Sequence, residues 1–173
     1  VVEHDRKTIL VERGLLAGAH RFVVAVVAIP LPRLSIEPDV IVHLRPTGPL
    51  RTGAEIDEAI ELLAAHPEAN SVRSVEEPDK PPYKMWQPDG IFLKPFAEVA
   101  GMKDFHTMPR QMLPKVYQTT ADIGIMWART VKEKHSVIGD KVLPYFLNRP
   151  TVDIDKPIDF EFAELLLKKS SSL

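Results

Sequence analysis

A chain of 173 residues can form one domain with a buried core, and its 45% hydrophobic and 27% charged residues are typical of a globular protein. The net charge of −2 argues against a broad basic surface for nucleic acid or an anionic membrane, and the absence of cysteine excludes disulfides, thiolate metal sites and cysteine nucleophiles. Sixteen prolines against eight glycines indicate stiff turns and abruptly ended elements.

The amino-terminal part predicts one helix and two strands. Residues 1–7 read like the end of a strand and contain neither an initiator methionine nor a signal peptide, so we expect the sequence to begin inside a fold. Residues 7–19 predict a helix with Gly18 near its end. The Val-rich run 21–29, too short to span a bilayer, and residues 39–44 predict strands.

The next segment contains the strongest helix signal in the sequence. Thr52 and Glu55 have the spacing of a capping box, and apolar residues recur on one helical face until Pro67. Residues 71–75 predict a strand. The order strand, helix, strand favours a βαβ crossover with parallel strands.

The second half alternates between an irregular segment and regular elements. Residues 76–114 are apolar but broken by prolines, with short β pieces at 85–86, 91–93 and 96, and we expect an arm that contacts another subunit. Residues 122–130 predict a strand, and a final helix begins at Pro157 before a fraying tail. We therefore expect one α/β domain over residues 1–173, with residues 76–121 as the arm.

Residues 45–51 form the first candidate binding segment. Gly48 and Gly53 have the spacing of a Walker A loop, but Ala54 stands where the lysine is required, so that motif is excluded. The segment still leads from a strand into a helix, where α/β proteins bind anions, and Arg45 and Arg51 suit phosphate or carboxylate. A rigid turn with solvated arginines is an equally good interpretation.

Two further segments carry candidate chemistry. Asp153 and Asp155 would lie on one face of an extended segment. Their carboxylates would repel each other unless a cation such as Mg²⁺ lies between them. Alternatively, Asp155 caps the final helix. The segment 108–118 places Arg110, Gln111, Lys115 and Gln118 among apolar residues. This set suits a carboxylated, hydroxyl-rich ligand or the rim of an interface. The six histidines show no metal-ligand spacing.

Four runs, in order, resemble the acylneuraminate cytidylyltransferases, the CMP-sialic acid synthetases. PDVIVHLRPTGPLRT is similar to the family's strand and Leu-Gln-Pro-Thr-Ser-Pro-Leu-Arg loop, and PRQMLPKVYQ and VDIDKPIDFEFAE resemble two later blocks. The opening VVEHDRKTILVERGLLAGA is similar to an early strand end, turn and helix of the family. The resemblance spans most of the chain.

The resemblance implies a nucleotide-diphospho-sugar-transferase-like three-layer α/β fold with a protruding dimerisation insert. The implied reaction transfers CMP from CTP to a nine-carbon keto-sugar acid of the N-acylneuraminate type and releases pyrophosphate. Asp153 and Asp155 would be catalytic and hold Mg²⁺. The substrate-binding residues would be Arg45, Thr47, Arg51, Lys84, Arg110, Gln111 and Gln118, with Arg110 serving the neighbouring site of a homodimer or tetramer. A cytoplasmic enzyme without nucleic-acid or membrane partners is expected.

The sequence departs from the family pattern at several positions. Arg45 replaces the loop glutamine, Gly48 replaces its serine, and Thr120-Ala121 replaces an Asn-Gly pair. The family's amino-terminal nucleotide-binding strand and basic glycine loop have no counterpart in the sequence, so we expect that unit to be missing. Two alternatives follow: a cytidylyltransferase for legionaminic, pseudaminic or deoxy-octulosonic acid, or a non-catalytic homologue that binds a sugar or a partner.

Overall fold

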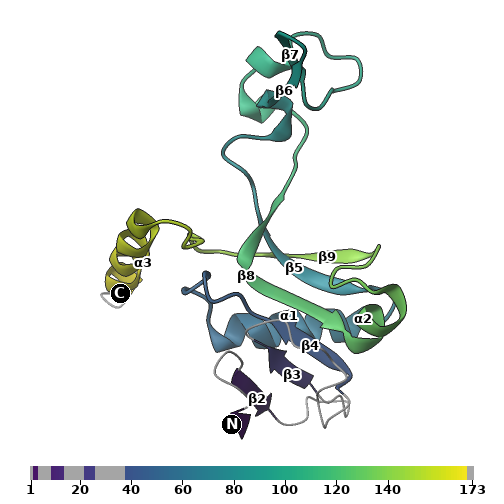
Figure 1. Cartoon of the computed structure of the whole chain (residues 1–173), viewed down its shortest axis with the longest axis vertical. Coiled ribbons are helices and arrows are strands. Elements are labelled where there is room, and N and C mark those ends of the chain that lie inside the picture. Colours follow the sequence, from purple (N-terminus) through teal and green to yellow (C-terminus); the bar gives the residue numbers. More distant parts are fainter. Residues whose placement is uncertain (1, 4–8, 14–21, 26–37, 171–173) are drawn as a thin grey trace. The chain divides into compact units, whose positions relative to one another are not determined.

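The computed structural model describes residues 2–3, 9–13, 22–25 and 38–170. The chain divides into two compact units. The sheet unit contains Val1–Val75 and Thr119–Leu173, and the insert contains Glu76–Gln118. Each unit has its own arrangement of elements, and Figure 1 shows both.

Within the described residues, the sheet unit has one mixed sheet in the order β1-β2-β3-β4-β8-β5-β9. Its strands are β1 (Val2–Glu3), β2 (Ile9–Arg13), β3 (Phe22–Ala25), β4 (Val40–His43), β5 (Ser71–Glu76), β8 (Gln118–Trp127) and β9 (Val142–Phe146). The pairs β3–β4 and β5–β9 are parallel, whereas β1–β2, β2–β3 and β4–β8 are antiparallel. The predicted α/β class is confirmed, with β8 separating β4 from β5.

The core lies between the sheet and α1 (Gly53–Ala65), which Figure 1 shows beside β4. Side chains alternate along β4, so Val40 and Val42 are buried against α1. The predicted capping box is confirmed. The backbone N–H of Thr52 donates to Glu55 Oε2 at 2.7 Å, and the N–H of Glu55 donates to Thr52 Oγ1 at 3.3 Å. These bonds satisfy two of the N–H groups that begin the helix without partners.

The helix predicted over residues 7–19 is wrong where the structure describes it. Residues 9–13 form strand β2 and not a helix, because Ile9, Leu10 and Val11 are consecutive apolar residues, two of them β-branched, that suit a sheet. The rest of the predicted helix, residues 7–8 and 14–19, lies outside the described residues. The strand prediction for 21–29 is confirmed over 22–25, and its remaining residues also lie outside.

The predicted strand 122–130 ends at Trp127, where α2 (Ala128–Lys134) begins. Residues 128–134 are mostly good helix formers, which explains this early change. Strand β9 was not predicted because Pro144 interrupts its sequence. The strand lies at the edge of the described sheet, where a residue without an N–H group is tolerated.

The final helix, α3 (Pro157–Ser170), begins at the predicted residue, with proline at a position that needs no N–H donor. The tail predicted to fray covers residues 168–172. Residues 168–170 belong to α3, so the prediction is wrong there, and residues 171–172 lie outside the described part. Among the described residues, no helix has the length and apolar character needed to cross a bilayer.

The insert contains short elements. The antiparallel hairpin of β6 (Trp86–Asp89) and β7 (Phe92–Pro95) confirms the predicted β pieces, and Gly90 has a positive φ of 63° in its turn. Single helical turns lie at η2 (Pro82–Lys84), η3 (Phe105–Thr107) and η4 (Arg110–Met112). Several large apolar side chains of the insert are exposed, including Ile91 (92%) and Phe92 (72%).

Candidate functional site

The loop 45–51 joins β4 to α1 and is held mainly by its own residues. Arg51 Nη1 donates to the carbonyl oxygens of Arg45 at 2.7 Å and Gly48 at 2.5 Å. Burial lowers the pKa of Arg51, an effect that the nearby carboxylate of Asp122 opposes. One arginine of the pair predicted to bind an anion therefore stabilises the loop backbone, whereas the side chain of Arg45 is exposed.

Gly48 explains one departure from the family pattern. A Cβ atom at this position would lie 3.0 Å from the carbonyl oxygen of Ala121 and 3.2 Å from Arg51 Nη1. These separations are tighter than an ordinary van der Waals contact, so a serine side chain would be crowded here. The glycine lets the loop pass close to the backbone of β8.

The predicted carboxylate pair lies beside this loop. The backbone N–H of Ile154 donates to the carbonyl oxygen of Thr47 at 2.9 Å, which joins the segment 153–155 to the loop 45–51. The segment is irregular and not an extended strand, since the N–H of Asp155 donates to the carbonyl oxygen of Asp153 at 3.1 Å. The expected strand geometry is therefore wrong, although the pair still adjoins the loop.

The hydrogen bonds at the start of α3 show which aspartate caps this helix. Asp159 Oδ2 accepts from the backbone N–H of Asp155 at 3.0 Å and of Lys156 at 2.8 Å, so Asp159 satisfies the start of α3. Asp153 and Asp155 are exposed, and their carboxylates have no hydrogen-bond or ion-pair partner in the described part of the chain. The pair has the charge and the hard oxygen donors that suit Mg²⁺.

The described residues contain no larger candidate metal site than a pair of carboxylates such as this one. In the described ranges, no group of three or more His, Asp or Glu side chains could hold an ion. Mg²⁺ is commonly bound through one or two carboxylates together with substrate phosphates and water. Two exposed carboxylates therefore fit a cation that arrives with a phosphorylated ligand better than one held permanently by the protein.

Sequence reasoning missed an ionic cluster that supports the same corner. Arg149 donates from Nε to Glu55 Oε1 at 2.7 Å and from Nη2 to Asp122 Oδ1 at 2.9 Å, and Asp122 is only 1% exposed. Burial raises the pKa of Glu55, but the hydrogen bonds from Arg149 and Thr52 outweigh it and hold that pKa below its usual value. The signal in the sequence was the charged side chain of Asp122 within the otherwise apolar run of residues 121–127.

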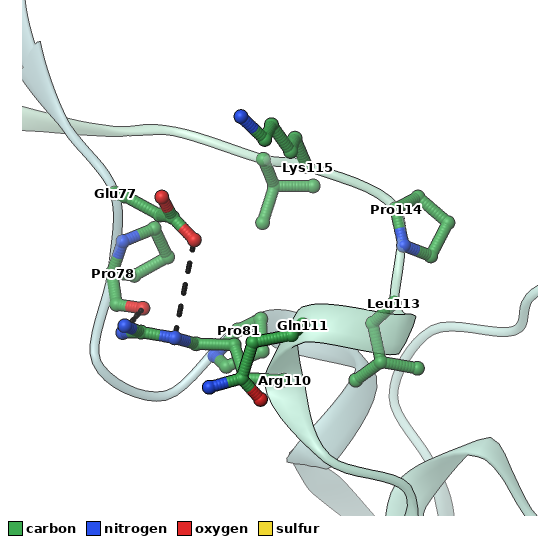
Figure 2. Close-up of a pocket in the computed structure, with 9 residues that line it drawn as sticks. Glu77, Pro78, Pro81, Arg110, Gln111, Leu113, Pro114 and Lys115 are labelled. Carbon is green, nitrogen blue, oxygen red and sulfur yellow. Dashed lines mark hydrogen bonds and ion pairs between the residues drawn. The ribbon is translucent and has the colours of Figure 1, made fainter.

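The insert contains a separate pocket (Figure 2) with a volume of about 310 Å³. Its lining includes the predicted residues Arg110 and Gln111, together with Glu77, Pro78, Pro81, Leu113, Pro114, Lys115 and Val116. This volume is at the small end of the range for small-molecule sites. Polar groups from 77–78 and 110–111 share the pocket with apolar walls, as expected for a site that orients a polar ligand.

Arg110 is the central cation of this pocket. Its Nη1 donates to the carbonyl oxygen of Pro78 at 3.2 Å, and its guanidinium lies 3.9 Å from Glu77 and 3.6 Å from Asp79. Figure 2 shows the side chains of Arg110 and Glu77 pointing toward each other. Long ion pairs at a partly exposed site contribute little free energy, so a ligand carboxylate could replace them.

The remaining predicted residues are outside this pocket lining. Lys84 ends η2 and is half-buried, and Gln118 Nε2 donates to Glu76 Oε1 at 2.7 Å. The structure therefore brings together the loop 45–51 and the pair Asp153 and Asp155 in the sheet unit. Separately, it brings Arg110 and Gln111 together in the insert.

No protein-family model matches the chain, but the chain is similar to a curated protein. The relative is "Post-translational flagellin modification protein B" of Campylobacter coli, which is 26% identical over 135 residues. The match covers 77% of this chain and 54% of the relative, so the chain spans about half the length of the protein it resembles.

Proposed function

We propose that this chain belongs to an enzyme that transfers CMP from CTP to a nine-carbon keto-sugar acid and releases pyrophosphate. The observation that carries the proposal is the hydrogen bond from Ile154 to Thr47, at 2.9 Å, which holds two unpaired carboxylates beside a loop at a helix N-terminus. Carboxylates suit a phosphate-bound cation, and a helix N-terminus favours the phosphates themselves.

In this proposal, Asp153 and Asp155 hold Mg²⁺, which when bound offsets phosphate charge and acidifies a hydroxyl group. Arg51 keeps the loop 45–51 in place through its bonds to Arg45 and Gly48, and Thr47 fixes the position of the carboxylate segment. The pocket of the insert is a separate part of the proposal, in which the side chains of Arg110 and Gln111 serve the neighbouring site of a dimer and bind the acid and hydroxyl groups of the sugar. Lys84 and Gln118 contribute further donors from the insert.

The relative favours a more specific assignment. Its name describes post-translational modification of flagellin, so we propose that the activated sugar serves protein modification. Arg45 replaces a neutral amide with a fixed cation, so the family pattern does not decide which keto-sugar acid is the acceptor. Legionaminic, pseudaminic and deoxy-octulosonic acids are therefore included as acceptors.

The test is pyrophosphate release by the full-length protein with CTP, Mg²⁺ and each of four acids: N-acetylneuraminic, legionaminic, pseudaminic and deoxy-octulosonic acid. We expect one acid to support turnover above the rate with CTP alone. ATP, GTP and UTP in place of CTP are the matched controls. If no acid supports release while the protein binds one of them, the chain is a sugar-binding homologue and the enzymatic proposal is wrong.

We further propose that the insert contacts a second copy of the chain. Its hairpin exposes Ile91 (92%), Phe92 (72%) and Leu93 (64%), and an isolated two-stranded hairpin with such side chains is only marginally stable in water. We expect Phe92→Asp to raise the dimer dissociation constant about thirtyfold or more, measured by sedimentation equilibrium, because it places a charge in the apolar contact.

Phe160→Asp is the matched control, since Phe160 is 56% exposed but lies on α3 outside the insert. This variant should dimerise like the unaltered protein. A monomeric unaltered protein, or a Phe92→Asp variant that dimerises normally, would show that the hairpin is not the subunit contact.

A further inference from the structure

One buried cation of the sheet unit has no negatively charged partner among the residues that the structure describes. Arg73 lies on β5 and is 9% exposed. Its Nη2 donates to the carbonyl oxygen of Val137 at 2.7 Å, whereas its Nε is buried and has no hydrogen-bond partner. No carboxylate forms an ion pair with Arg73 in the described residues. A guanidinium remains charged, and burying it without a counter-ion costs several kcal/mol.

The backbone of β8 makes room for this guanidinium. A Cβ atom on Gly124 would lie 2.2 Å from Arg73 Nη1 and 3.1 Å from its Cζ, so the guanidinium occupies the space that a side chain would fill. Gly124 pairs in register with His43 of the neighbouring strand β4. The side chain of Arg73 therefore extends from β5 across β8, in the direction of His43.

Two further basic side chains share this region. His43 ends β4, and Arg45 follows it by two residues. Burial lowers the pKa of His43, and the charges of Arg73 and then Arg45 lower it further, which indicates that the three groups interact. Burial also lowers the pKa of Arg73, and Arg45 adds to that effect. We name these three side chains the cationic row after the charges of Arg45 and Arg73. His43, with its lowered pKa, is neutral at pH 7 and contributes a ring N–H donor.

We propose that the cationic row binds an oxyanion, a phosphate or carboxylate group of a ligand. Such a group would accept hydrogen bonds from the guanidinium of Arg73 and supply the missing negative charge. The absence of a side chain on Gly124 leaves space for the guanidinium. The hydrogen bond to the carbonyl oxygen of Val137 fixes its position before the ligand binds.

The site itself does not depend on the reaction proposed above, but the choice of anion rests on it. In that reaction the anion is either a phosphate of the nucleotide or the carboxylate of the sugar acid. Both groups present oxygen acceptors with the geometry that a guanidinium recognises. Sodium pyrophosphate and sodium pyruvate represent the two sources in the test.

The test is isothermal titration calorimetry of the full-length protein with each anion. We expect the unaltered protein to bind at least one of them, and Arg73→Met to weaken that binding about tenfold or more, because charged hydrogen bonds are lost. Arg129→Met is the matched control. Arg129 is exposed and contacts the carbonyl oxygen of Pro67 and the ring of Trp127.

Binding of pyrophosphate alone would assign the row to the nucleotide, and binding of pyruvate alone would assign it to the sugar acid. The inference is wrong if the unaltered protein binds neither anion, or if Arg73→Met binds as tightly as the unaltered protein. Turnover is measured separately. If the unaltered protein binds an anion but shows no turnover with CTP and any of the acids, the proposed function is wrong and the inference about the cationic row still stands.

A second variant tests the same site from the backbone side. Gly124→Ala places a methyl group where Arg73 Nη1 now lies, so we expect it to weaken anion binding about as much as Arg73→Met. The double variant should show no further loss, since the two changes affect one interaction. Additive losses would show that Gly124 acts independently of Arg73, contrary to this arrangement.

Discussion

Replacing Asp155 by Asn is expected to reduce pyrophosphate release about a thousandfold while leaving the free energy of unfolding unchanged within about 0.5 kcal/mol. The change removes one of two negative charges from the donor set formed with Asp153. Its small effect on stability follows from the hydrogen bonds of Asp159, which already accepts from the backbone N–H groups of Asp155 and Lys156. Initial rates and urea denaturation of the same preparation measure the two effects.

Asp159→Ala provides the control because it lies four residues away and has the opposite role. We expect it to lower the free energy of unfolding by about 1 kcal/mol, because alanine cannot accept the two bonds that begin α3, and to keep turnover within about tenfold of the original rate. Full turnover by Asp155→Asn would remove Asp155 from the reaction. A loss of stability by Asp155→Asn equal to that of Asp159→Ala would return Asp155 to a capping role.

Replacing Arg149 by Met is expected to lower the free energy of unfolding by about 3–5 kcal/mol, the usual cost of removing one partner from a buried ion pair. The variant leaves the carboxylate of Asp122, only 1% exposed, without its 2.9 Å bond from Nη2. It also frees Glu55 from Arg149 at the start of α1. Urea denaturation at pH 7 measures the loss.

Two further measurements separate the ionic effect from a packing defect. Arg149→Met combined with Asp122→Asn should recover part of the stability, because the second change removes the uncompensated charge. Arg129→Met, at an exposed arginine, should cost less than about 1 kcal/mol. A loss below about 1 kcal/mol for Arg149→Met would show that the cluster does not stabilise the sheet unit.

The acid dependence of this effect has a definite sign. The pKa of Glu55 in the folded protein is below its unperturbed value of 4.5, so its interaction with Arg149 stabilises the folded state above that pH. This contribution is lost as the pH falls through the folded pKa. The difference in stability between the unaltered protein and Arg149→Met should therefore be largest above about pH 4.5 and smaller in more acidic solution.

The sequence predicted where two helices of the sheet unit begin, because each start depends on residues only a few positions apart. The capping box of Thr52 and Glu55 placed the start of α1, and Pro157 placed the start of α3. Residues 9–13 fall within the predicted helix 7–19 because Ile9, Leu10, Leu15 and Leu16 are apolar residues among charged ones. Pairing with β1 and β3, which no local pattern encodes, makes residues 9–13 a strand.

Long-range features could not be predicted in the same way. The ion pairs of Arg149 with Asp122 and Glu55 join residues that are far apart in the sequence, so no local pattern predicts them. The same holds for the contact between Arg73 and Gly124. For the candidate site, the sequence predicted both the loop 45–51 and the carboxylate pair. The hydrogen bond between Thr47 and Ile154 that joins them had no sequence signal, because it involves backbone groups alone.

The position of β8 determines when the sheet can be completed during synthesis. β4 and β5 leave the ribosome before the insert, but the strand that lies between them, Gln118–Trp127, follows it. A nascent chain that ends before β8 therefore has β4 and β5 without the strand that lies between them in the sheet. Val42 pairs with Ile125, which is synthesised more than 80 residues later, so the core forms late and through contacts between distant parts of the sequence. Until then, the growing chain exposes unpaired strand edges that favour aggregation.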